Sequence, residues 1–207
     1  FAVDYIGRSG FSIPYLDGSL SISRASRTFP QYLIFKPAMI ITAVALYFYW
    51  TNNNNLINRG ISGQTSPQML IRFKQDAVHL KPKLIIINAG TNDIAANTGP
   101  ATPEMIIDNI TSMAEIGSKN SINVALSTIL PVDRYDWNET IKDAPEIISK
   151  VNRSLKKYAE ENNLIFIDYY SSLVNNNKGM KSSYANDGVH PTKEGYDVMA
   201  IVLKDTL

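Results

Sequence analysis

From about residue 55 onward, beginning with a short extended piece at Leu56–Asn58, short apolar segments alternate with longer segments of helical periodicity. The clearest apolar segment is Lys83–Asn88 (KLIIIN), which has the length of a strand buried on both faces. Two more strands are predicted, at Val124–Ser127 and Leu164–Asp168. Because strands that alternate with helices form parallel sheets covered on both faces, the sequence predicts an α/β fold, an α/β/α sandwich with a central parallel sheet.

The expected helices are marked by their first residues. Thr65-Ser66-Pro67 and Thr102-Pro103-Glu104 each combine a hydroxyl cap with a proline in the first turn, and Thr192 is predicted to cap the last helix. A further helix is expected from Ala144 to Glu161, through apolar residues at helical spacing. We expect the helix after Thr102 to end at Gly117, since glycine is common at helix ends.

The length of 207 residues predicts a single domain, spanning residues 1–207. Phe1–Ile6 (FAVDYI) is interpreted as the first strand and Gly7–Gly10 as its turn. Residues 10–50 are predicted to be an irregular insertion, rich in Ser, Gly, Pro and aromatic residues in its first part. The apolar run Ala38–Trp50 is too short for a transmembrane segment, which needs about 20 residues.

The charge and the rare residue types exclude several classes of function. There are 20 Lys and Arg residues against 19 Asp and Glu, and this balance argues against nucleic acid as a partner. The sequence has no cysteine, which excludes disulfides, thiolate nucleophiles and zinc sites built on sulfur. Any imidazole chemistry must use His79 or His190, the only two histidines. The chain begins at Phe1, and if a signal peptide was removed, a periplasmic or secreted location is favoured.

The segment before the last predicted helix is the most informative for chemistry. In Asp187-Gly188-Val189-His190, the glycine lets the chain turn and bring the carboxylate to the imidazole. A carboxylate that accepts from Nδ1–H leaves Nε2 free as a base. The alternative is a capping aspartate and a surface histidine ahead of a helix.

Two other segments follow predicted strands, at the edge where α/β sites lie. Asn92, in Gly90-Thr91-Asn92-Asp93, offers an uncharged amide donor to a developing oxyanion, and Asp93 is expected to hold that loop. Gly63 has no side chain to keep a ligand from its backbone N–H, and it lies just before a helix start. Each segment taken alone is also compatible with an ordinary turn.

Taken together, the three segments resemble the SGNH (GDSL-type) hydrolase family. The resemblance runs from about Asn55 to the C-terminus, through NRGISGQTSPQML, INAGTNDIA and YANDGVHPTKEGY. It is similar above all to small bacterial acylhydrolases and carbohydrate esterases, which implies a flavodoxin-like sandwich. It also implies that Gly63 and Asn92 form the oxyanion hole and that Asp187 and His190 belong to a catalytic triad. The implied reaction is hydrolysis of a small acyl ester, such as an O-acetylated sugar or a lysophospholipid, without metal or cofactor.

The family's first sequence block, Gly-Asp-Ser after the first strand, is not found here. The nearest match is Gly7-Arg8-Ser9, which predicts Ser9 as the nucleophile and its N–H as a third oxyanion donor. The other alignment places the block near Phe35–Thr42 (FKPAMIIT), where Thr42 is the only hydroxyl. In that case the family's nucleophile is absent.

Two alternative functions follow from these observations. A protein that lost the serine but kept the other loops would be a catalytically inactive module that binds carbohydrate or lipid. A weaker alternative is a flavodoxin-like domain that binds flavin or a nucleotide. The loop residues Asp133, Arg134, Asp136 and Trp137 either shape the substrate pocket or form a solvated loop.

Overall fold

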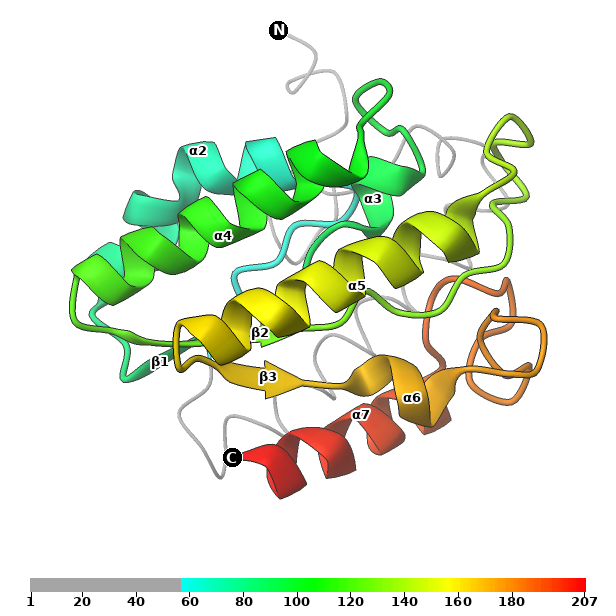
Figure 1. The fold of residues 1–207 in the computed structure, drawn as a ribbon. Helices are drawn as coiled ribbons and strands as arrows, with labels where there is room; N and C mark the ends of the chain where they lie inside the picture. The colour runs from blue at the N-terminus through cyan, green and yellow to red at the C-terminus, as the bar shows by residue number, and fades with distance from the viewer. Residues whose placement is uncertain (1–56) are drawn as a thin grey trace, which may run out of the picture. The chain divides into compact units, whose positions relative to one another are not determined.

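The computed structural model describes residues 57–207. The contacts divide the chain into two compact units, Phe1–Gly63 and Gln64–Leu207. The second unit contains all of the described helices and strands, and Figure 1 shows their order along the chain. The predicted first strand, Ser9 and the proposed insertion at 10–50 lie outside the described residues, so the single-domain prediction stays a prediction.

The second unit is built around three parallel strands, β1 (Leu84–Ile87), β2 (Asn123–Ser127) and β3 (Ile165–Ile167), in the order β1-β2-β3. In their register, Ile85 pairs with Val124 and Leu126 pairs with Phe166. This arrangement confirms the predicted α/β fold with a central parallel sheet.

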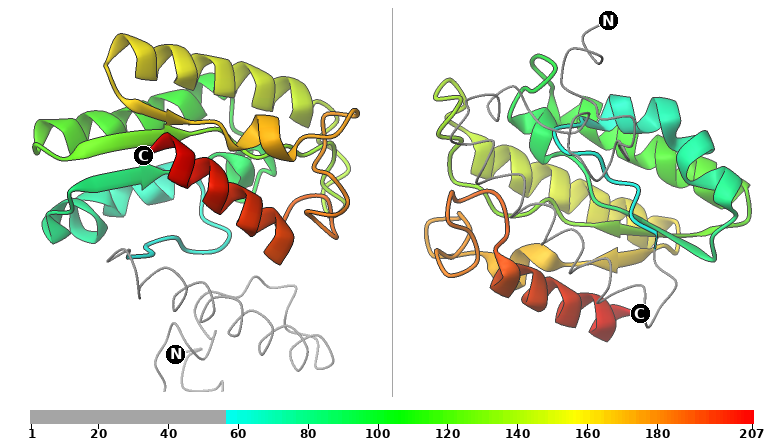
Figure 2. Two further views of the ribbon diagram at one scale, coloured as in Figure 1. Left: turned by 90° about the horizontal axis from the view of Figure 1, so that it is seen from below. Right: turned by 180° about the vertical axis from the view of Figure 1, so that it is seen from behind.

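Helices pack on the sheet at the positions that the cap residues predicted. α4 (Pro103–Lys119) contacts β1 and β2, and α5 (Ala144–Glu161) contacts β2 and β3. α7 (Lys193–Thr206) contacts β3 from the other side, as Figure 2 shows. α2 (Ser66–Asp76) packs on α4 and is followed by the 3₁₀ helix η2 (Val78–Leu80). The short helices α3 (Thr91–Ile94) and α6 (Tyr169–Leu173) follow the ends of β1 and β3.

The end of α4 differs from the sequence prediction. Gly117 lies inside the helix, which continues to Lys119. A Cβ at Gly117 would lie 2.7 Å from Val124 Cγ2, closer than packed carbon atoms come. The glycine is therefore required for close approach of α4 to β2 and does not mark the helix end.

The core of this unit lies between the sheet and the α4–α5 layer. Its centre is formed by side chains that are at most 1% exposed, from α4, β2 and α5: Ile106, Ile110, Met113, Leu126, Ile148, Val151 and Leu155. This packing fixes the carboxyl ends of the strands and thus the loops that follow them. Among residues 57–207, no helix has the length and apolarity to span a membrane.

Candidate active site

The loop before α7 holds the strongest catalytic geometry in the described part of the chain. His190 Nδ1 lies 2.7 Å from Asp187 Oδ2, and the other carboxylate oxygen accepts from the amides of Val189 (3.0 Å) and His190 (2.8 Å). Gly188 has a φ of +75°, a left-handed conformation that glycine adopts without strain. The turn thus brings the carboxylate to the imidazole, as the spacing predicted.

These contacts determine the charge of Asp187. Burial acts to raise the pKa of this carboxyl, but hydrogen bonds from the His190 amide, the His190 ring and the Val189 amide outweigh it. The pKa therefore lies below the ordinary value of 3.8, and Asp187 is ionised at neutral pH. An ionised acceptor at Nδ1 keeps the proton on that nitrogen and leaves Nε2 as the basic atom. The His190 side chain is 71% exposed, so this nitrogen is accessible.

Asn92 lies in α3, immediately beyond the carboxyl end of β1. Its Nδ2 donates to the Gln64 carbonyl (2.8 Å), and its Oδ1 accepts from Asn97 Nδ2 (3.1 Å). These two bonds fix the plane of the amide, and the NH₂ group has a second hydrogen to donate. An amide held in this way is suited to an oxyanion, because it needs no rearrangement when charge develops.

The turn that carries Asn92 depends on Gly90. Gly90 has a φ of +116°, and a Cβ there would lie 2.4 Å from Ile129 Cδ1. Ile129 is held in turn by Asn152 of α5, which bonds both the Ile129 amide (2.7 Å) and the Ile129 carbonyl (3.0 Å). The turn that positions Asn92 thus depends on the packing of Gly90 against Ile129, which Asn152 of α5 holds in place.

Asp93 has a structural role that extends beyond its own loop. Its carboxylate accepts from the Ser66 amide (3.0 and 2.9 Å) and from Ser66 Oγ (2.6 Å) at the start of α2. Asn109 Nδ2 also donates to Ser66 Oγ (3.1 Å). Asp93 is 2% exposed, and this burial raises its pKa, although the bonds from Ser66 oppose the shift.

Sequence reasoning left the role of Trp137 open, and the structure places it beside the histidine. The indole stacks on the His190 ring with centroids 6.1 Å apart and an angle of 28° between planes. Tyr135 makes a T-shaped contact with Trp137, with ring centroids 5.3 Å apart, and its hydroxyl donates to the Thr91 carbonyl (3.1 Å). Trp137 and Tyr135 therefore connect His190 to the helix that carries Asn92.

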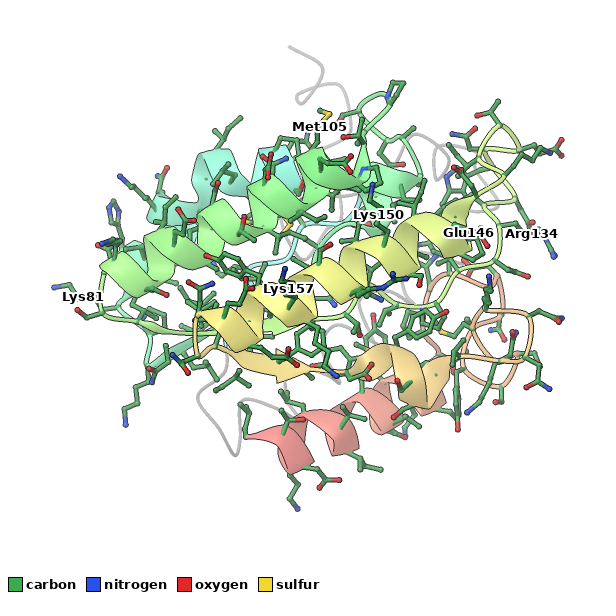
Figure 3. All side chains as sticks on the ribbon, in the orientation of Figure 1. Lys81, Met105, Arg134, Glu146, Lys150 and Lys157 are labelled. Carbon is green, nitrogen blue, oxygen red and sulfur yellow. The ribbon has the colours of Figure 1, made fainter. Side chains whose placement is uncertain are left out.

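Figure 1 shows the loops of these residues at the end of the sheet where β3 leads into α6: the loop before α5 and the loop before α7. In Figure 3, Arg134 points outward at this end, whereas Lys81 lies at the opposite end. Arg134 is paired with Asp136 (2.8 Å) and Asp133 (3.7 Å) within its own loop. His79 is exposed in η2 and makes no contact with this site in the described structure.

Two of the predicted site residues lie outside the second unit, which contains Asn92, Asp187 and His190. Ser9 lies outside the described residues. Gly63 has a φ of +80°, which fits the turn predicted for it, but it belongs to the first unit. Within residues 57–207, no group of three or more His, Asp or Glu side chains is arranged to hold a metal ion.

Comparison with known proteins decides the family. Residues 41–198 match the GDSL-like Lipase/Acylhydrolase family. The chain belongs to this family. It is therefore an esterase-type hydrolase with the fold expected for SGNH enzymes. The matched range includes Thr42 and excludes Ser9.

Solved structures agree with this assignment. A proposed acylhydrolase from Bacteroides fragilis is 47% identical, with a TM-score of 0.75, and 78% of each chain is covered. A GDSL-like lipase from Bacteroides thetaiotaomicron is 44% identical, with the same TM-score and 78% of this chain and 80% of that chain covered. These relatives share the fold and the family with this chain.

Two curated proteins are also similar. An acetylxylan esterase from Geobacillus stearothermophilus is 25% identical over 152 residues, which cover 70% of this chain and 68% of that protein. An uncharacterised lipoprotein from Bacillus subtilis is 32% identical over 83 residues, or 39% of this chain. The match spans only about a third (34%) of the lipoprotein's length.

Proposed function

We propose that this chain hydrolyses small acyl esters, O-acetylated carbohydrates above all, with His190 as general base. The observation that carries this proposal is the 2.7 Å contact between His190 Nδ1 and the ionised Asp187 carboxylate. A histidine oriented in this way accepts a proton at Nε2 and later returns it. The similarity to an acetylxylan esterase supports the choice of acetylated sugars within the esters that acylhydrolases cleave.

The proposed reaction is acyl transfer to a serine and then to water, with Ser9 as the nucleophile. His190 Nε2 takes the hydroxyl proton while the serine oxygen attacks the acyl carbon. The bond to the alcohol then breaks, and His190 delivers the proton to the departing alkoxide. Water attacks the acyl-enzyme by the same route and releases the acid. No metal or cofactor takes part.

The negative oxygen of each tetrahedral intermediate needs donors that are already in place. Asn92 Nδ2 is one of them, because its amide plane is fixed by Gln64 and Asn97. The N–H groups of Gly63 and Ser9 are proposed as the other two. The left-handed φ of Gly63 supports this role, since it turns the backbone sharply just before α2.

Hydrolysis of 4-nitrophenyl acetate tests the proposal, with the parent compared with Ser9→Ala, His190→Gln and His79→Gln. We expect the Ser9 and His190 variants to lose activity by roughly 10³-fold or more and His79→Gln to match the parent. Full activity in Ser9→Ala would exclude Ser9 as the nucleophile. Full activity in His190→Gln would exclude the imidazole base.

The second candidate is a module that binds carbohydrate or lipid without turnover. One observation favours it: the family match begins at residue 41 and so does not include Ser9. An inactive parent that still binds acetylated sugar would support this alternative. The Asp187–His190 pair would then be a remnant of the catalytic site.

A further inference from the structure

Trp137 is a large apolar side chain left in solvent beside the proposed base. Its side chain is 53% exposed, although an indole gains more than most side chains from burial. The indole stacks on the His190 ring and makes a T-shaped contact with the Tyr135 ring, so it lies beside the proposed base. An exposed aromatic ring at such a place is suited to bind a ligand.

The backbone around Trp137 is anchored on both sides. Tyr135 is 1% exposed, and its hydroxyl donates to Thr91. Burial, helped by the charge of Asp93, raises the pKa of Tyr135, so the phenol keeps its proton for that bond. Asn138 Nδ2 donates to the Ala95 carbonyl (3.1 Å) at the end of α3. Trp137 therefore lies between two fixed neighbours, which lowers the conformational entropy that a ligand must remove.

The same loop packs against the segment before α7 at a second place. A Cβ at Gly179 would lie 2.8 Å from Asp133 Cγ, and one at Gly188 would lie 3.8 Å from Asp133 Oδ1. The first distance is too short for a side chain at position 179, whereas the second is an ordinary van der Waals contact. The contact between Trp137 and His190 is thus part of a larger packed interface between the two loops.

The chemistry of ester cleavage says which part of the substrate meets Trp137. The histidine must protonate the alkoxide that leaves, so the alcohol lies next to the imidazole, whereas the acyl oxygen faces the oxyanion donors. A ring stacked beside the imidazole is therefore on the alcohol side. Arg134, three residues before Trp137, is paired with Asp136 and Asp133 within its own loop, so its guanidinium already has carboxylate partners.

We infer that Trp137 is the specificity-determining residue for the alcohol and that it binds the flat apolar face of a pyranose ring. This inference rests on the proposed function, because it assigns the alcohol of the ester that His190 helps to cleave. It adds a subsite for the sugar to a site otherwise defined by its acyl chemistry.

The test compares two acetate esters with the same acyl group and different alcohols, methyl tri-O-acetyl-β-xyloside and ethyl acetate. We expect Trp137→Ala to lower kcat/KM for the xyloside about tenfold, mainly through KM, and to leave ethyl acetate within about twofold. Trp137→Phe should keep most of the xyloside activity. Met105→Ala on α4 is the matched control, since Met105 is 50% exposed and is labelled in Figure 3 away from Arg134 and its loop.

An equal loss on both esters would overturn the inference, because Trp137 would then act on His190 and not on the alcohol. No loss on either ester would also overturn it. If the parent cleaves neither ester, the proposed function fails, and saturation-transfer NMR with the xyloside decides the inference separately. A signal in the parent that disappears in Trp137→Ala supports the sugar subsite, and no signal in the parent contradicts it.

Discussion

Asp93 lies in the short helix α3 and Asp187 in the loop before α7, and both accept backbone and side-chain hydrogen bonds. Asp93 is 2% exposed and bonds Ser66 at the start of α2. The Asp187 side chain is 48% exposed and bonds the ring of His190. The shifts of their pKa values have opposite directions, upward for Asp93 and downward for Asp187.

The difference separates a buried carboxylate that joins two elements from an exposed carboxylate that contacts a histidine ring. Asp93 has no access to substrate, and its bonds join two elements that are far apart in the sequence. Asp187 joins residues only two and three positions away, and it leaves the histidine in solvent. We therefore expect substitution of Asp187 to affect the reaction and substitution of Asp93 to affect the fold.

The largest effect is expected for Asp187→Asn. The new amide would place an NH₂ group against His190 Nδ1, which favours the tautomer with its proton on Nε2. Hydrolysis of 4-nitrophenyl acetate should fall by roughly 10³–10⁴-fold, the usual effect of the wrong tautomer. The midpoint of urea unfolding should move little. Asp205→Asn, the same change at an exposed position of α7, is the control and should leave the rate unchanged.

Asn92→Ala is expected to have the next effect on rate. The loss of one oxyanion donor should lower kcat by about 10²–10³-fold. The bond to the Gln64 carbonyl is also lost, and this should cost about 1 kcal/mol of unfolding free energy. An unchanged kcat per folded molecule, combined with a large loss of stability, would instead make Asn92 structural like Asp93.

Asp93→Asn should lower the stability of the protein and leave its rate of ester hydrolysis nearly unchanged. An NH₂ group in place of one carboxylate oxygen would face the buried donors of Ser66, so the free energy of unfolding should fall by about 2–3 kcal/mol. The rate per folded molecule should stay within a few-fold of the parent. Urea titration followed by circular dichroism measures the first quantity, and an assay corrected for the folded fraction measures the second.

The smallest expected effect is on the pH dependence of stability at acid pH, where Asp187 and Asp93 should act in opposite directions. The folded pKa of Asp187 lies below 3.8, so its stabilising effect is present above that pH and is lost as pH falls further. The folded pKa of Asp93 lies above 3.8, so protonation of Asp93 adds stability as pH falls towards that value. Urea unfolding at several acid pH values should therefore show how the free energy of unfolding decreases as pH falls. Relative to the parent, this decrease should be shallower in Asp187→Asn and steeper in Asp93→Asn. Identical pH dependence in both variants would contradict the assigned shifts.

Local signals predicted the fold and the contact between Asp187 and His190. The cap residues Thr102 and Thr192 bond the amides of Met105 (3.2 Å) and Gly195 (3.3 Å), and each lies within three residues of its partner. The spacing of Asp187 and His190 was informative for the same reason. Such contacts are determined by short segments of chain and can be inferred from them.

The contacts that sequence reasoning missed are long-range. Gly117 was interpreted as a helix end, since glycine is common there. The true reason for the glycine is its contact with Val124, which arises only when α4 packs on β2. Asp93 was expected to accept backbone N–H bonds, but sequence reasoning did not identify Ser66, 27 positions away, as the donor. The stacking of Trp137 on His190 joins two loops that only the assembled sheet brings together. No periodicity or motif records such pairs.

Covalent labelling by diethyl 4-nitrophenyl phosphate, with the modified peptide mapped by mass spectrometry, tests most directly whether His190 activates a serine. The phosphorus would be attacked by the nucleophile with release of 4-nitrophenolate, so the label marks the reacting oxygen. We expect one label per chain, on Ser9, formed at a rate that falls by roughly 10³-fold or more in His190→Asn. A parent that takes no label, or a label that forms equally fast without the His190 imidazole, would contradict this mechanism.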